Sequence, residues 1–109
     1  MQAKAIARSV RISPFKVRQV LPLIRGKGVS AAITALHYSP KKAARLVEKV
    51  LKSAVANAAN NLSLDVDTLK VVEATADQGP VMKRFNPVSM GRAHAYVHRT
   101  CHIAVTVAE

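Results

Sequence analysis

The sequence predicts an α+β fold: a small antiparallel three-stranded sheet packed on three helices, with a long protruding β-hairpin. Three observations lead to this prediction. Alternating segments lie near the N-terminus, at residues 68–77 and at the C-terminus. Apolar residues at helical spacing fill the region between the N-terminal segment and residue 68, and a basic stretch separates residues 68–77 from the C-terminal segment. With 109 residues, the chain is predicted to form a single domain over residues 1–109.

The first predicted elements are a strand and a helix. Residues 3–12 alternate roughly, and one face of this strand would carry Lys4, Ile6, Arg8, Val10 and Ile12. Ser13 and Pro14 suit the N-cap and first position of a helix, with Ile12 and Val17 as a hydrophobic staple. Pro22 removes a backbone hydrogen bond, so a kink or early break is expected there. The buried stripe of this helix would be Val17, Val20, Leu21 and Ile24.

Two further helices follow in the predicted order. Residues 29–38 form a short helix that buries Ile33 and Leu36. Ser39 and Pro40 open a long helix over residues 40–61, with Asn60 or Asn61 as a left-handed C-cap. Its buried face has helical spacing, at positions 43, 44, 47, 50, 51, 54, 55 and 58. Its opposite face carries four cations, with Glu48 placed to pair with the last: Lys42, Arg45, Lys49 and Lys52.

The stretch GPVMKRFNPVSMGRAHAYVHRTCH, residues 79–102, contains no Asp or Glu and lies between strands at 68–77 and 102–109. Those flanking strands predict a hairpin that turns around NPVSMG, with an extension over about residues 79–100. At about 3.3 Å per residue its arms would reach roughly 25 to 30 Å beyond the sheet, too far for a small core to bury. Apolar side chains along it could wedge or stack against bases: Met82, Phe85, Met90 and Tyr96.

The charge distribution predicts a polyanionic partner. The formal charge is +11, from 17 Lys and Arg against 6 Asp and Glu. Five acids lie between Glu48 and Asp77 and the sixth is Glu109, so residues 1–47 and 78–108 contain none. Nucleic acid is the favoured partner. The predicted contacts are basic side chains and two histidines: Lys4, Arg8, Arg11, Lys16, Arg18, Arg25, Lys27, Lys42, Arg45, Lys49, Lys52, Lys83, Arg84, Arg92, His94, His98 and Arg99.

A metal site and an active site are the alternatives to binding. His94, His98 and Cys101 would converge on a helix, but on a strand the two histidines share a face about 13 Å apart. The alternation that continues into IAVTV favours a strand, so no metal or other cofactor is expected. Cys101 has the parity of Ile103, which predicts a buried thiol. No catalytic arrangement is recognisable, so the chain is predicted not to be an enzyme. No apolar run approaches the roughly 18 residues of a membrane span.

Three stretches resemble the family of bacterial large-subunit ribosomal protein twenty-two: SPFKVRQV with LIRGK, KKAARLVEKVLKSAVANAANN, and DQGPVMKRFNPVSMGRAHAYVHRTCHIAV. The resemblance implies a cytoplasmic protein of the ribosome that binds large-subunit ribosomal RNA and neighbouring ribosomal proteins and supports subunit assembly. It also implies a hairpin that lines the nascent-peptide exit tunnel, meets the nascent peptide and can influence macrolide response. The tunnel-lining role would belong to the tip: Pro87, Val88, Ser89, Met90, Gly91 and Arg92.

The alternative prediction is a DNA-bending architectural protein that uses a basic β-ribbon arm. Such proteins usually act as symmetric dimers with two arms. The ribosomal prediction requires no obligate homo-oligomer. The oligomeric state and the preference for duplex DNA would therefore distinguish the two.

Overall fold

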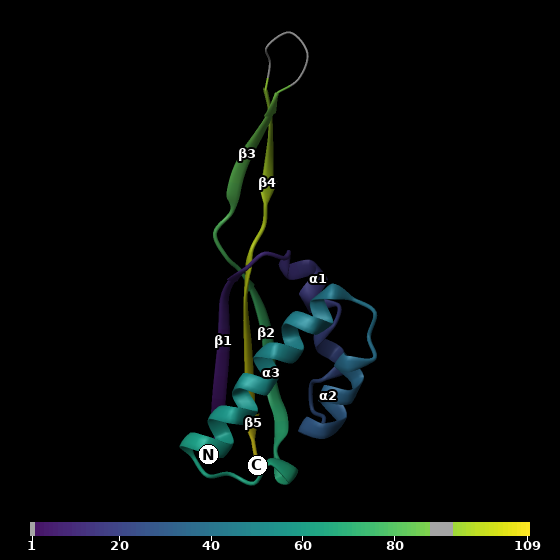
Figure 1. Cartoon of the computed structure of the whole chain (residues 1–109), viewed down its shortest axis with the longest axis vertical. Coiled ribbons are helices and arrows are strands. Elements are labelled where there is room, and N and C mark those ends of the chain that lie inside the picture. The colour runs from purple at the N-terminus through teal and green to yellow at the C-terminus, as the bar shows by residue number, and fades with distance from the viewer. Residues whose placement is uncertain (1, 88–92) are drawn as a thin grey trace.

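The computed structural model describes the backbone of residues 2–87 and 93–109 and the side chains of residues 2–81, 83 and 99–109. Strands and helices follow one another as β1 (Gln2–Val10), α1 (Pro14–Arg18), η1 (Leu21–Leu23), α2 (Val29–His37), α3 (Lys42–Asn61), η2 (Val66–Thr68), β2 (Lys70–Gln78), β3 (Met82–Pro87), β4 (Ala93–His98) and β5 (Cys101–Ala108). A body of sheet and helices carries the projecting hairpin β3–β4 (Figure 1). The predicted α+β fold is confirmed.

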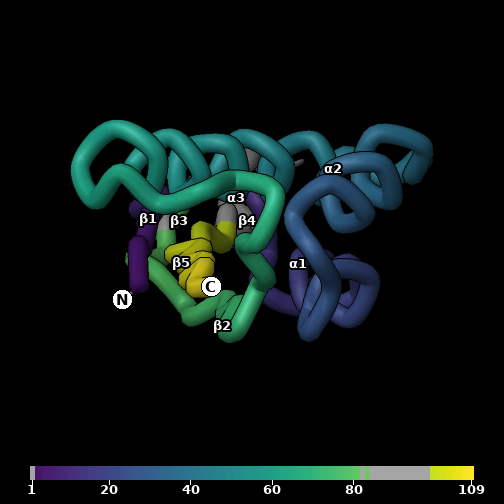
Figure 2. Tube along the Cα trace, turned by 90° about the horizontal axis from the view of Figure 1, so that it is seen from below, coloured from purple at the N-terminus to yellow at the C-terminus, as the bar shows by residue number. Residues whose placement is uncertain are grey.

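The body sheet has the order β1-β5-β2, with β5 antiparallel to both neighbours. Ile103, Val105 and Val107 of β5 are fully buried, as their alternation predicts. α3 lies across β1 and β5 on one face of this sheet, and none of the described helices covers the opposite face (Figure 2). The opposite face of β5 is mixed, because His102 and Ala104 are half-buried whereas Thr106 and Ala108 are buried.

The alternation of β1 fails beyond Arg8, and the prediction of one shared face is wrong there. The register shifts between Ala7 and Val10, and Ser9 has a φ of 55°. The Ser9 N–H donates to Nδ1 of His102 at 2.9 Å. Such a bulge adds a residue and reverses which face the next side chains take. Val10 therefore packs against the core and Ile12 is buried, whereas Lys4, Ile6 and Arg8 stay exposed.

The first helix is broken, as Pro22 predicts. α1 ends at Arg18, and Pro22 lies inside the separate 3-10 turn η1. Ser13 occupies the N-cap position but makes no side-chain capping bond. The apolar stripe survives the break, because Val17, Val20, Leu21 and Ile24 are all fully buried.

The predicted start and C-cap of the long helix need correction, whereas its end at residue 61 agrees with the prediction. α3 begins at Lys42 with Lys41 as N-cap, because Lys41 is still extended at φ −76° and ψ 139°. Asn60 and Asn61 lie inside the helix, and the left-handed residue is Ser63, with a φ of 53°. The predicted buried face is confirmed, with Val55 half-buried and the other seven positions buried. α2 agrees with its prediction to within one residue, burying Leu36 fully and Ile33 partly.

The hairpin is a separate two-stranded sheet. β3 and β4 pair antiparallel, from Met82↔His98 to Pro87↔Ala93. The Gly79 N–H donates to the Thr100 carbonyl at 2.9 Å where the two arms leave the body. A Cβ at Gly79 would lie 2.6 Å from Thr100 Oγ1, so a larger residue would push the arms apart. Of the predicted tip, Pro87 ends β3, and residues 88–92 lie outside the described residues.

Candidate nucleic-acid interface

Every Lys and Arg whose side chain is described is exposed. Thirteen predicted contacts belong to this group: Lys4, Arg8, Arg11, Lys16, Arg18, Arg25, Lys27, Lys42, Arg45, Lys49, Lys52, Lys83 and Arg99. The side chains of Arg84, Arg92, His94 and His98 lie outside the described part, as do those of the predicted tip. Lys41 and Lys70 are exposed cations that the prediction omitted.

Four cations surround a surface cavity of about 400 Å³ between α1 and the start of α3. Its floor includes Ile12 and Ala43, and four basic side chains line it together with Gln19: Arg11, Lys16, Lys41 and Lys42. The Lys41 ammonium donates to Oε1 of Gln19 at 3.1 Å, which fixes it at the cavity. No carboxylate belongs to this lining, so the like charges repel one another until an anion binds. We call these four residues and Gln19 the basic cavity.

The outer face of α3 adds cations around one buried acid. Glu48 is 8% exposed, and its carboxylate lies 3.2 Å from Lys52 Nζ and 3.7 Å from Arg45 Nη1. The predicted Glu48–Lys52 pair is therefore confirmed. The Arg45 guanidinium also donates to the carbonyls of Leu36 and Ser39 at 2.6 and 2.9 Å. Arg45 thus ties the end of α2 to α3, a role that its sequence position did not indicate.

Arg18 and Arg25 also have structural partners. Arg18 Nε donates to the Ala76 carbonyl at 3.0 Å, and Arg25 donates to the Ala74 carbonyl from Nε and Nη2 at 3.2 and 2.8 Å. Ala74 and Ala76 lie on β2, an edge strand whose outer carbonyls would otherwise be open. The two guanidiniums therefore cover this edge.

The helix-free face of the sheet carries charges of both signs. A hollow of about 340 Å³ brings basic residues of β1 together with acidic residues of β2, across β5. It is lined by Lys4, Ile6, Arg8, Glu73, Thr75, Asp77, His102 and Ala104. Because Glu73 and Asp77 offset Lys4 and Arg8, this face suits a polyanion less well than the basic cavity does.

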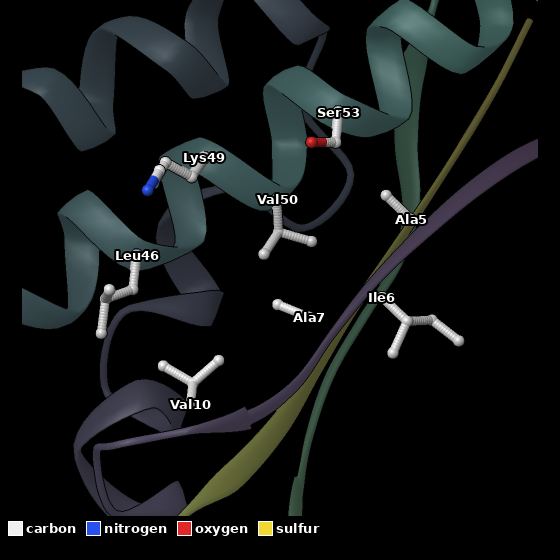
Figure 3. Close-up of a pocket in the computed structure, with 8 residues that line it drawn as sticks. All are labelled: Ala5, Ile6, Ala7, Val10, Leu46, Lys49, Val50 and Ser53. Carbon is white, nitrogen blue, oxygen red and sulfur yellow. The ribbon is translucent and has the colours of Figure 1, made fainter.

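A groove of about 290 Å³ between β1 and α3 is mainly apolar. Figure 3 shows Ala7 and Val10 of β1 directed toward Leu46 and Val50 of α3, whereas Ile6 points away from the groove. Lys49 and Ser53 bring one ammonium and one hydroxyl, and its lining includes no carboxylate, imidazole or thiol. This groove therefore holds no pair of groups for acid–base catalysis.

The predicted strand placement of the histidines is confirmed, because His94 and His98 both belong to β4. Cys101 is fully buried, and burial raises the pKa of its thiol while nearby Arg18 opposes that rise. Among the described residues, no cluster of three or more His, Cys, Asp or Glu could hold a metal ion. None of the described helices is long and apolar enough to cross a membrane.

Comparison with known proteins identifies the family. The model of the family "Ribosomal protein L22p/L17e" matches residues 5–108. The chain is also 57% identical over 109 residues to the "Large ribosomal subunit protein uL22" of Clostridium novyi (strain NT), an alignment covering 100% of this chain and 98% of that protein. The chain therefore belongs to the L22p/L17e family of ribosomal proteins, structural and non-enzymatic components of the large ribosomal subunit in the cytoplasm.

Proposed function

We propose that the chain binds large-subunit ribosomal RNA through the basic cavity and the outer face of α3, and thereby supports assembly of the subunit. The observation that carries this proposal is the convergence of Arg11, Lys16, Lys41 and Lys42 on one cavity with no carboxylate in its lining. The repulsion among these cations is relieved when a phosphate enters between them. The N-terminus of α3 adds partial positive charge at the same place, since Lys41 makes no side-chain cap.

We also propose that the hairpin lines the nascent-peptide exit tunnel, where its tip meets the nascent peptide and influences macrolide response. The family membership supports this role, together with the projection of β3 and β4 from the body (Figure 1). The molecule measures 63 Å along its longest axis and only 16 Å along its shortest. The hairpin β3–β4 has little of its own protein to pack against, so we expect it to pack against RNA and neighbouring ribosomal proteins.

The salt dependence of RNA binding tests the role of the basic cavity. The affinity of the full chain for large-subunit ribosomal RNA should fall linearly with salt on a log–log plot, because phosphate contacts release counterions. Lys16→Ala should weaken binding and reduce the slope by about one. Lys70→Ala is the matched control, since Lys70 lies on β2 with the acids Glu73 and Asp77. A flat salt plot, or equal effects of the two substitutions, would contradict the proposal.

A further inference from the structure

Phe15 is a large aromatic residue that the fold does not use in its core. Its side chain is 70% exposed, although its neighbours Pro14 and Val17 on α1 are buried. The chain contains only two Phe and two Tyr residues and no Trp. Exposing one of these rings to water forgoes the largest apolar burial that α1 offers. The ring of Phe15 is therefore accessible to a binding partner.

Phe15 lies beside two arginines at the base of the hairpin. A hollow of about 340 Å³ is lined by Ser13, Pro14, Phe15, Arg18, Gln78 and Arg99. These residues come from the start of α1, the end of β2 and the connection between β4 and β5, and α1 lies where the hairpin leaves the body (Figure 1). No carboxylate belongs to the lining. The hollow thus combines an aromatic face with two guanidiniums and one amide.

One of the two arginines is held in place before any partner arrives. Arg18 Nε donates to the Ala76 carbonyl at 3.0 Å, so the guanidinium is fixed on the edge of β2. The backbone of Phe15 belongs to helix α1, which places its ring beside Arg18 in the hollow. A site that is ordered in advance loses less conformational entropy on binding.

We propose that this hollow binds one unstacked nucleotide of RNA, with the base stacked on the Phe15 ring and the adjacent phosphate contacted by Arg18 and Arg99. The inference rests on the proposed RNA-binding function and names a discrete site within it. Proteins recognise single-stranded RNA by stacking splayed bases on aromatic rings and by pairing arginines with the backbone. A basic hollow with an exposed ring meets both requirements, whereas the basic cavity contains cations but no aromatic side chain.

A tryptophan substitution tests the stacking directly. The chain contains no Trp, so Phe15→Trp introduces a single fluorophore at the site. Addition of large-subunit ribosomal RNA should quench its emission, because the indole stacks against a base. Val72→Trp is the control: Val72 is 52% exposed on β2, next to Glu73, and is not among the residues that line this hollow. Its emission should change little.

A second substitution separates stacking from charge. Phe15→Leu keeps an apolar side chain but removes the aromatic face, so affinity for the same RNA should fall roughly tenfold. The slope of the salt plot should stay unchanged, since no cation is lost. Normal RNA affinity of Phe15→Leu with unquenched Phe15→Trp would overturn the stacking site while leaving the proposed function intact. The stacking site would likewise be overturned, and the proposed function left intact, if Phe15→Leu impaired only the binding of another ribosomal protein. Failure of the unmodified chain to bind RNA would overturn both proposals.

Discussion

At the scale of single residues, Cys101 shows how burial controls a reactive group. The thiol begins β5 and is fully buried, and this burial raises its pKa above the ordinary value of 9.0. The folded chain therefore holds the thiol proton more tightly than the unfolded chain does. The resulting contribution to stability is present below about pH 9 and is lost as the pH rises through the pKa of the folded thiol.

This environment predicts that the Cys101 thiol is alkylated slowly in the folded chain. At about pH 8, iodoacetamide should alkylate the folded chain at least about tenfold more slowly than the chain unfolded in urea, because both access and the thiolate fraction are reduced. Mass spectrometry of timed samples would measure both rates. Equal rates would show that the thiol is open to solvent in the folded chain.

At the scale of elements, the edge of β2 is covered by backbone and side-chain donors of the segment that precedes α2. Arg25 donates two hydrogen bonds to the Ala74 carbonyl, and the Gly26 N–H donates to the Val71 carbonyl at 3.0 Å. Gly26 makes its contact at a φ of +75°, a conformation that glycine adopts without strain. Together these bonds leave little of the β2 edge open to another strand.

Arg25→Ala should lower the free energy of unfolding by about 1 kcal/mol, because the Ala74 carbonyl loses both donors. Arg25→Lys should recover only part of the loss, since an ammonium cannot reproduce the planar fork. Lys27→Ala removes an exposed cation two residues away and serves as the control. Urea denaturation of the three variants would measure these differences. An equal loss in Arg25→Ala and Lys27→Ala would mean that the hydrogen bonds to β2 contribute nothing.

The elements that the sequence predicts well are those with one continuously buried face. The apolar face of β5 and the helical spacing of α3 correspond to burial, so both elements could be identified without the structure, although Thr106 and Ala108 on the other face of β5 are buried too. The bulge in β1 could not, because it depends on a hydrogen bond between Ser9 and His102, which are 93 residues apart in the chain. The start of α3 was misplaced for a local reason, since the chain remains extended at Lys41 after Pro40.

At the candidate site too, some features follow from the sequence and others depend on contacts between distant residues. Positive charge alone predicts that the Lys and Arg side chains reach the surface, and all the described ones do. It does not reveal that Arg18, Arg25 and Arg45 donate to backbone carbonyls, nor that Lys41 joins the basic cavity. These partners lie on other elements, so only the fold brings them together. The proximity of Phe15 to Gln78 and Arg99 could not be predicted for the same reason.

At the scale of the whole molecule, two separate sheets divide the chain into a body and a ribbon. β3 and β4 hydrogen-bond to each other and belong to a sheet distinct from β1-β5-β2. The core of the body is built from the described residues of the other elements, chiefly α3 against β1 and β5. The ribbon is thus joined to the body mainly at its base, where Gly79 bonds to Thr100.

Replacing residues 82–98 by Asn-Gly should therefore leave the body folded. The Gly79–Thr100 bond holds the two ends close enough for a two-residue hairpin turn, which that dipeptide favours. Thermal unfolding should remain cooperative, with a midpoint within a few degrees of the full chain, because the buried face of α3 is untouched.

Binding of the shortened chain to ribosomal RNA through the basic cavity should persist, whereas ribosomes that carry the shortened chain should lose the cross-links between this chain and the nascent peptide. A non-cooperative transition would show that the ribbon is part of the folding unit, and cross-links that survive the deletion would refute the proposed position of the hairpin in the tunnel.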